Sequence, residues 1–364
     1  MNYWKSTGVR CLVIIAQMGL LAAVAPALAA GGKVYVADEE SSTVSVIDAA
    51  SFRKIGSIAV GLGPHNVQVA PDGKTVWVTN NGEPGTAAAQ APNASMPTGM
   101  PKSAPRTLPT GEHGSMAGAG AVWAIDTATD GVVAKVPVGK DPAHVVVTAD
   151  GRYAYVANGG DNSVSVVDIP ALRVVATIPV GAGPHGMRLS PDGKEAWVAN
   201  LKGGTVSVID TGSRKLVASI AVGRGPAQVG FTPDGRLGFV SLSKEGRVAV
   251  IDPARRKLIR KVTVGTVPIQ LYATPDSRLL LVANQGTREK PGKTVNIIDL
   301  GTLKSVATIE TGPGAHGVVI DREGRRAFVT NTYANTVSVL DIALRSVIGT
   351  VPVGRGPNGV SVTP

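Results

Sequence analysis

The sequence predicts an all-β chain built from repeats of four short strands, and three observations lead to this prediction. Glycine and proline make up 70 of the 364 residues, about 19% against roughly 12% in ordinary proteins, which favours turns over long helices. Short apolar segments ending in turn residues recur with a period close to 42 residues. With 43% apolar residues, the chain can bury enough surface to fold, which excludes a disordered chain.

Each repeat contains the same four elements in the same order. In one repeat, a first strand follows Pro184 and ends at Pro-Asp-Gly (191–193), and a second strand ends in asparagine at Trp-Val-Ala-Asn (197–200). A third strand closes on aspartate, and a fourth leads into Val-Gly before the next repeat. The first strands follow six prolines, with Ala315 in the remaining slot: Pro64, Pro142, Pro184, Pro226, Pro268 and Pro357. Four strands in about 42 residues is typical of a propeller blade.

The two ends of the chain complete one blade. Six repeats are complete, whereas the chain enters its first repeat at the second strand, near Lys33, and ends after one first strand at 358–362. The prediction is a seven-bladed β-propeller with four antiparallel strands per blade, whose last blade is closed by the N- and C-terminal strands. Blade 1 begins at His65, and it carries an insertion at 81–120 that is rich in Pro, Gly, Ala, Ser and Thr and that we expect to be flexible.

The first 29 residues have the pattern of a secretory signal peptide. Lys5 and Arg10 precede an apolar stretch over 11–24, followed by a small-residue cleavage site at 27–29. The stretch is shorter than the 18 or more residues of a spanning helix. We therefore expect residues 30–364 to form a single propeller domain, periplasmic or secreted and monomeric. The only cysteine, Cys11, lies in the signal, which excludes disulfide frameworks, cysteine-ligated zinc and iron–sulfur clusters.

The asparagine-ending strand, the Pro-Asp-Gly turn and the period of about 42 residues resemble the YVTN-repeat β-propeller family, which includes YncE-like periplasmic and secreted proteins. The resemblance covers nearly all of the expected mature chain, from Lys33 to Pro364. It implies the fold, and it implies little about function because the motif residues build blades. More distant propellers with similar repeats bind haem, hold copper or hydrolyse sugar lactones.

The repeated polar residues are expected to be structural. One aspartate ends the third strand of each blade, where its carboxylate can accept backbone N–H groups of the following turn. Asparagines such as Asn158 and Asn200 end the second strands, where we expect left-handed or Asx-turn geometry. A metal or catalytic site would break this seven-fold regularity.

The histidines depart from the repeat. The upper face of a blade carries the loop into its first strand and the turn between its second and third strands; the lower face carries the other two turns. Four histidines follow the slots that open first strands, and the fifth lies in the insertion: His65, His144, His185, His316 and His113. All five are therefore predicted on the upper face.

Three of these histidines approach three-fold spacing in a seven-membered ring, since His65, His185 and His316 belong to blades 1, 3 and 6. Converging imidazoles suit Cu²⁺ or Zn²⁺, and one imidazole suits a haem iron. The insertion adds soft ligands for copper and is a candidate lid: Met96, Met100 and Met116. Two alternatives remain open, a structural packing role for the histidines and a small organic ligand.

The charge predicts a second candidate surface. The chain has a formal net charge of +10, and the lower-face turns are rich in basic residues. The polyanion rim comprises Arg214, Lys215, Arg255, Arg256 and Lys257. Such a rim can attract acidic polymers or an anionic membrane surface; the alternative is a solvated hairpin face. Few aromatic residues lie in these turns, which argues against base stacking and sequence-specific nucleic-acid binding.

The motifs of enzymes are largely missing from the sequence. There is no G-x-S-x-G motif and no glycine-rich phosphate loop. The upper face has few carboxylates: Asp38, Glu39, Glu40, Glu83, Asp141 and Asp161. The sequence favours a non-enzymatic platform that binds an unidentified small ligand or protein through its histidine face and lid. The alternatives are a periplasmic copper- or haem-associated accessory protein or oxidoreductase and, third, a metal-dependent lactonase-like hydrolase.

Overall fold

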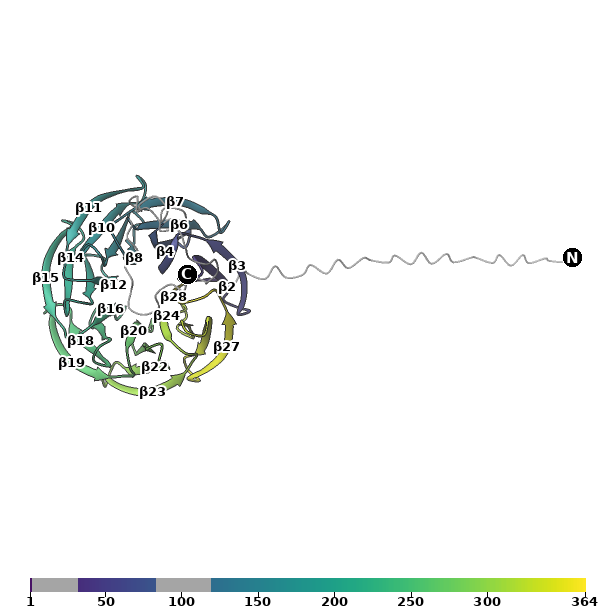
Figure 1. The fold of residues 1–364 in the computed structure, drawn as a ribbon. Helices are drawn as coiled ribbons and strands as arrows, with labels where there is room; N and C mark the ends of the chain where they lie inside the picture. The colour runs from purple at the N-terminus through teal and green to yellow at the C-terminus, as the bar shows by residue number, and fades with distance from the viewer. Residues whose placement is uncertain (2–31, 83–118) are drawn as a thin grey trace, which may run out of the picture. The chain divides into compact units, whose positions relative to one another are not determined.

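The structure is a computed structural model that describes residue 1, residues 32–82 and residues 119–364. The described chain from Gly32 onward forms seven four-stranded antiparallel sheets, which confirms the predicted seven-bladed β-propeller (Figure 1). In these described ranges there is no helix long and apolar enough to cross a membrane.

The strands of each blade are given from the innermost to the outermost. Blades 1 to 3 comprise β4 (Leu62–Val69), β5 (Thr75–Gly82), β6 (Ala121–Asp126) and β7 (Val132–Pro137); β8 (Pro142–Val147), β9 (Tyr153–Asn158), β10 (Ser163–Asp168) and β11 (Arg173–Pro179); β12 (Pro184–Leu189), β13 (Glu195–Asn200), β14 (Thr205–Asp210) and β15 (Lys215–Ala221). Blades 4 and 5 comprise β16 (Pro226–Phe231), β17 (Gly238–Leu242), β18 (Arg247–Asp252) and β19 (Lys257–Thr263); β20 (Pro268–Ala273), β21 (Leu279–Gly286), β22 (Pro291–Asp299) and β23 (Lys304–Glu310). Blades 6 and 7 comprise β24 (Ala315–Ile320), β25 (Arg326–Asn331), β26 (Thr336–Asp341) and β27 (Ser346–Pro352); β28 (Pro357–Val362), β1 (Lys33–Asp38), β2 (Thr43–Asp48) and β3 (Arg53–Ala59).

The seven sheets close into a ring. Each innermost strand contacts the innermost strands of both neighbouring blades, and β28 contacts both β24 and β4. In Figure 1 these strands surround the centre of the ring, and β3, β7, β11, β15, β19, β23 and β27 form its outer edge. The ring has a single axis, so side chains from non-adjacent blades can meet only there.

Burial follows the position of a strand in its blade. The second and third strands are buried on both faces, as in β13 and β14, because each sheet packs between two others. The outermost strands alternate or are mostly exposed, as in β15. Apolar side chains of adjacent sheets form the core; between blades 3 and 4, for example, Trp197 packs with Val208, Val229 and Val240. The core is therefore distributed around the ring and leaves the axis to other side chains.

The seven aspartates at the ends of third strands hold the lower-face turns, as predicted. In every blade this carboxylate accepts a hydrogen bond from the backbone N–H three residues further along the chain. The distance from Asp210 Oδ1 to Ser213 N, for example, is 2.7 Å. The other six are Asp48, Asp126, Asp168, Asp252, Asp299 and Asp341. These carboxylates are occupied by their own turns.

The left-handed geometry expected for the strand-ending asparagines is wrong, because none of them has a positive φ. Asn200 Nδ2 instead donates to Thr205 Oγ1 (2.9 Å) and Ser207 Oγ (3.0 Å) on the next strand. The buried amide thus braces two strands. The position of this amide also explains the glycine of the Val-Gly motif. A Cβ at Gly181 would lie 2.4 Å from Asn200 Nδ2, which is too close for a side chain.

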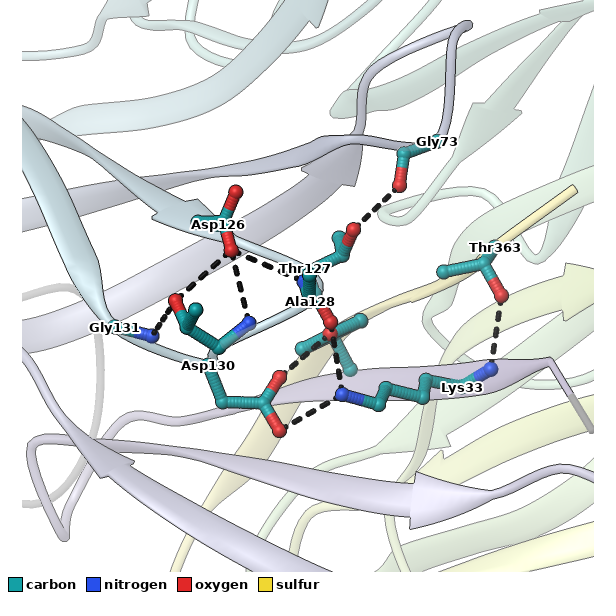
Figure 2. Close-up of polar contacts among 10 residues, drawn as sticks. Lys33, Gly73, Asp126, Thr127, Ala128, Asp130, Gly131 and Thr363 are labelled. Atoms are coloured by element: carbon teal, nitrogen blue, oxygen red, sulfur yellow. Dashed lines mark hydrogen bonds and ion pairs between the residues drawn. The ribbon is translucent and has the colours of Figure 1, made fainter. Parts of the chain in front are cut away.

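Blade 7 closes between the chain ends, as predicted, and it is also fastened to blade 1. β1 pairs with β28 on one side and with β2 on the other. Lys33 Nζ donates to Asp130 Oδ2 (2.9 Å) and to Thr127 O (2.8 Å), beyond the end of β6 (Figure 2). The hydroxyl of buried Tyr35 donates to Asp130 Oδ1 (2.8 Å). The closing blade is therefore held by side chains as well as by strand pairing.

Candidate metal centre

Four inner strands each carry one of the predicted histidines at their upper ends: β4, β8, β12 and β24. His65, His144, His185 and His316 are all buried, none more than 7% exposed. The centroid of the His65 ring lies 5.0 Å from that of His185, 5.9 Å from that of His144 and 6.3 Å from that of His316. Because these strands belong to blades 1, 2, 3 and 6, the four rings meet on the axis.

The closest group consists of His65, His144 and His185. One ring nitrogen from each lies within 4.8 Å of the others, and the two Nε2 atoms of His65 and His185 are 3.1 Å apart. A tetrahedral zinc site with Zn–N bonds of about 2.0–2.1 Å has nitrogens about 3.3 Å apart. The spacing therefore suits three imidazoles that share one small ion.

Blade spacing predicted a trio of His65, His185 and His316. In the structure, the closest group contains His144 in place of His316. The inner strands begin with irregular pairing, between Pro142 and Val145 in β8 and between Pro184 and Met187 in β12. Bulges re-aim side chains. His144 lies one position further along its strand than the other histidines, yet its ring centroid is 5.3 Å from that of His185.

Hydrogen bonds orient two of the rings. His185 Nδ1 lies 2.9 Å from Ala227 O, and because a carbonyl only accepts, Nδ1 carries the proton and Nε2 presents its lone pair to His65. On the other side, Asn358 Nδ2 lies 3.1 Å from His65 Nδ1 and donates to Glu39 Oε2 (2.7 Å). Glu39 Oε2 itself is 3.8 Å from His65 Nδ1. The Glu39 carboxylate therefore lies on the Nδ1 side of the His65 ring, where many metal-bound histidines have a carboxylate partner.

His144 is held neutral by its surroundings. Burial, followed by the neighbouring charges of His185, His65 and Arg188, lowers the pKa of His144 well below its usual 6.5. Its Nε2 is buried without a hydrogen bond to any of the described residues. At neutral pH this ring offers an uncharged donor for a metal and carries no proton that the metal must displace.

Four of the predicted ligands belong to the insertion of blade 1. His113, Met96, Met100 and Met116 lie in the part of the insertion, 83–118, that is outside the described residues.

Several residues of the polyanion rim have partners within the protein. Arg255 pairs with Asp252 (2.7 Å) and Arg256 with Glu195, and the Arg214 guanidinium lies 4.4 Å from the ring centroid of Tyr153. Lys215 and Lys257 begin the exposed outer strands β15 and β19.

Two residues gain importance only in the structure. Asn358 occupies the same position in blade 7 as His65 in blade 1, and Glu39 was notable only as one of few upper-face carboxylates. The sequence signal that could have found Asn358 is its place in the histidine column, where it is the one polar residue that is not a histidine.

Residues 115–237 match the model of the YncE-like β-propeller family. This segment is similar to YncE-like β-propellers. The match covers blades 2 and 3 and parts of their neighbours in the seven-bladed ring. No curated protein sequence matches the chain.

Solved structures support the fold of this propeller. It is similar to hydrazine synthase of Kuenenia stuttgartiensis (24% identity, TM-score 0.66, covering 82% of this chain and 88% of that chain). It is also similar to a periplasmic gluconolactonase of Pseudomonas aeruginosa (19%, 0.68, 92% and 99%) and to a dihydro-heme d1 dehydrogenase (17%, 0.62, 90% and 74%). At these identities the likeness shows the fold alone.

Proposed function

We propose that this protein is an exported propeller that binds one Cu²⁺ or Zn²⁺ ion on its axis through His65, His144 and His185 and uses this centre as a ligand-binding platform. The observation that carries the proposal is the approach of three buried ring nitrogens, from three blades, to within 4.8 Å of one another. The signal pattern of residues 1–29 supports export.

The arrangement favours a bare ion over a haem. Imidazole is a good ligand for copper and zinc, whereas the 3.1 Å between the Nε2 atoms of His65 and His185 leaves no room for a macrocycle between these two rings. Three protein ligands leave a tetrahedral ion one open position. An exogenous ligand can occupy that position, which is how a metal centre would serve a binding platform.

Metal binding also explains why three imidazoles are buried together. The Nε2 atom of buried His144 has no hydrogen-bond partner among the described residues, which costs free energy. A shared cation removes that cost by coordinating the lone pairs. The site would therefore bind its ion more tightly than three separate surface histidines.

The test is metal content and affinity in the purified mature chain. After treatment with a chelator, the protein is titrated with Zn²⁺ and with Cu²⁺ in competition with a chromophoric chelator. We expect one ion per chain. His144→Ala and His185→Ala should bind it more than about hundredfold more weakly, since removing a direct ligand should reduce the affinity more than removing a hydrogen-bond partner of a ligand. The matched control is His316→Ala, because His316 is a buried axial histidine outside the closest group. Equal affinity for all four proteins would refute the proposal.

A further inference from the structure

A second polar layer crosses the axis below the histidines. Arg188 on β12, Gln68 on β4 and Tyr272 on β20 each lie three residues beyond the position of His65 in their blades, about 10 Å along the strand. Arg188 Nη1 donates to Gln68 Oε1 (3.1 Å), and its guanidinium lies 5.1 Å from the ring centroid of Tyr272. Because blades 1, 3 and 5 are not adjacent, these contacts place the guanidinium on the axis.

Arg188 has no carboxylate partner among the described residues. Arg236, Arg255, Arg256 and Arg288 each form an ion pair, but Arg188 does not. A guanidinium in a half-buried position is partly desolvated, which is costly unless an anion compensates its charge. Among the described residues, Arg188 contacts an amide oxygen and an aromatic face.

The acidic residues closest along these three strands are occupied elsewhere. The turns that follow β4, β12 and β20 contain Asp72, Asp192 and Asp276. Asp72 accepts from Lys74 N, Asp192 from Ser190 Oγ and Lys194 N, and Asp276 from Thr274 Oγ1 and Arg278 N. These carboxylates stabilise their own turns, so none of the three pairs with Arg188 near the lower end of its strand.

We infer that Arg188 binds a small oxyanion, the carboxylate or phosphate group of a ligand that enters the axis from the lower face. Gln68 occupies one of the five N–H donors of the guanidinium, and the planar fork can present a pair of the others to two oxygens at once. Arg188, Gln68 and Tyr272 are all half-buried rather than sealed. Solvent can therefore reach them.

This site is separate from the proposed metal centre. Its residues bind the anion through hydrogen bonds and charge, so a protein stripped of metal should still bind it. The two sites are close enough for the charge of Arg188 to contribute to the lowered pKa of His144.

The experiment titrates the metal-free mature chain with inorganic phosphate and with acetate by calorimetry, with chloride as the control for ionic strength. We expect saturable binding of phosphate, acetate or both at one site. Arg188→Gln should weaken binding by about tenfold or more, the effect of losing a charged hydrogen-bond donor, and Arg188→Lys should be intermediate. Arg236→Gln removes an arginine that is already paired with Asp234 (2.7 Å) and should bind like the wild type.

A further variant keeps the test decisive if Arg188→Gln fails to fold. Gln68→Glu places a carboxylate beside Arg188 without changing side-chain size, so it should abolish anion binding. The new ion pair should offset the lost hydrogen bond from Gln68 Nε2 to Val69 O (3.0 Å), which keeps the protein folded. No saturable binding to the wild type, or wild-type affinity in either Arg188→Gln or Gln68→Glu, would overturn the inference. Zinc affinity measured on the same preparations reports separately on the metal centre.

Discussion

The most informative perturbation of the metal centre is the loss of the Glu39 carboxylate. When a metal takes the Nε2 lone pair of His65, the ring proton must move to Nδ1, which then needs an acceptor. Asn358 Nδ2, 3.1 Å from Nδ1, is a donor and cannot serve. Glu39 Oε2, 3.8 Å away, can accept the proton's hydrogen bond after a small movement. Glu39 should therefore stabilise the metal-bound tautomer of His65.

The size of the effect follows from the exposure of this carboxylate. Loss of an outer partner of a metal-bound histidine costs about 10- to 100-fold in affinity, or about 1.4–2.7 kcal/mol. Glu39 is 31% exposed, so solvent screens part of its charge. Glu39→Gln, which keeps an acceptor but loses the charge, should weaken zinc binding by about tenfold.

The assay compares Glu39→Gln with a neighbour. Glu40 lies in the same turn, but it pairs with Arg288 (2.9 Å), so Glu40→Gln should retain wild-type affinity. Both variants are titrated with Zn²⁺ against a chelator, and matched melting temperatures exclude a folding defect. The reasoning fails if the two variants bind zinc equally well, since they differ only in which carboxylate is removed.

Two further predictions concern the closing blade and the buried imidazole. Asp130→Ala leaves the buried hydroxyl of Tyr35 without its acceptor and removes the partner of Lys33, so it should lower the free energy of unfolding by about 2–3 kcal/mol. Asp130→Asn keeps an acceptor and tolerates the φ of 54°, so its free energy of unfolding should fall by about half as much. If denaturant titrations give both variants the free energy of unfolding of the wild type, the contact does not stabilise the protein. Because the pKa of His144 is lowered below 6.5 in the folded state, the unfolded chain binds more protons below that pH, so the metal-free protein should lose stability as the pH falls from 6.5 to 5. This loss should be smaller in His144→Asn, and the same dependence in both proteins would show that other groups cause it.

The blade architecture could be predicted from sequence because its signals are local. A strand of six residues that ends in Asn200, a turn held by Asp210 and a glycine at 181 each report on neighbours a few positions away. Repetition of these signals at a constant interval then determined the number of blades. The closure of blade 7 followed from counting strands, and the pairing of β1 with β28 confirms it.

The composition of the metal centre could be predicted only in part. The repeat placed four histidines at equivalent ends of inner strands, so their convergence on one face followed from the register. Which rings approach most closely depends on the side-chain positions in the closed ring, and these place His144 rather than His316 in the closest group. The roles of Glu39 and Asn358 depend on blade closure, because these residues are 319 positions apart in the chain.

The amino-acid order by itself determined the number of blades, the strands within each and the end of the ring at which the imidazoles gather, because strand alternation and turn chemistry act over a few residues. Only the tertiary structure decided which side chains meet on the axis. His65 and His185 are 120 positions apart, as are Gln68 and Arg188. Contacts over such separations depend on the curvature of the closed ring and on the reach of each side chain, which no local pattern encodes.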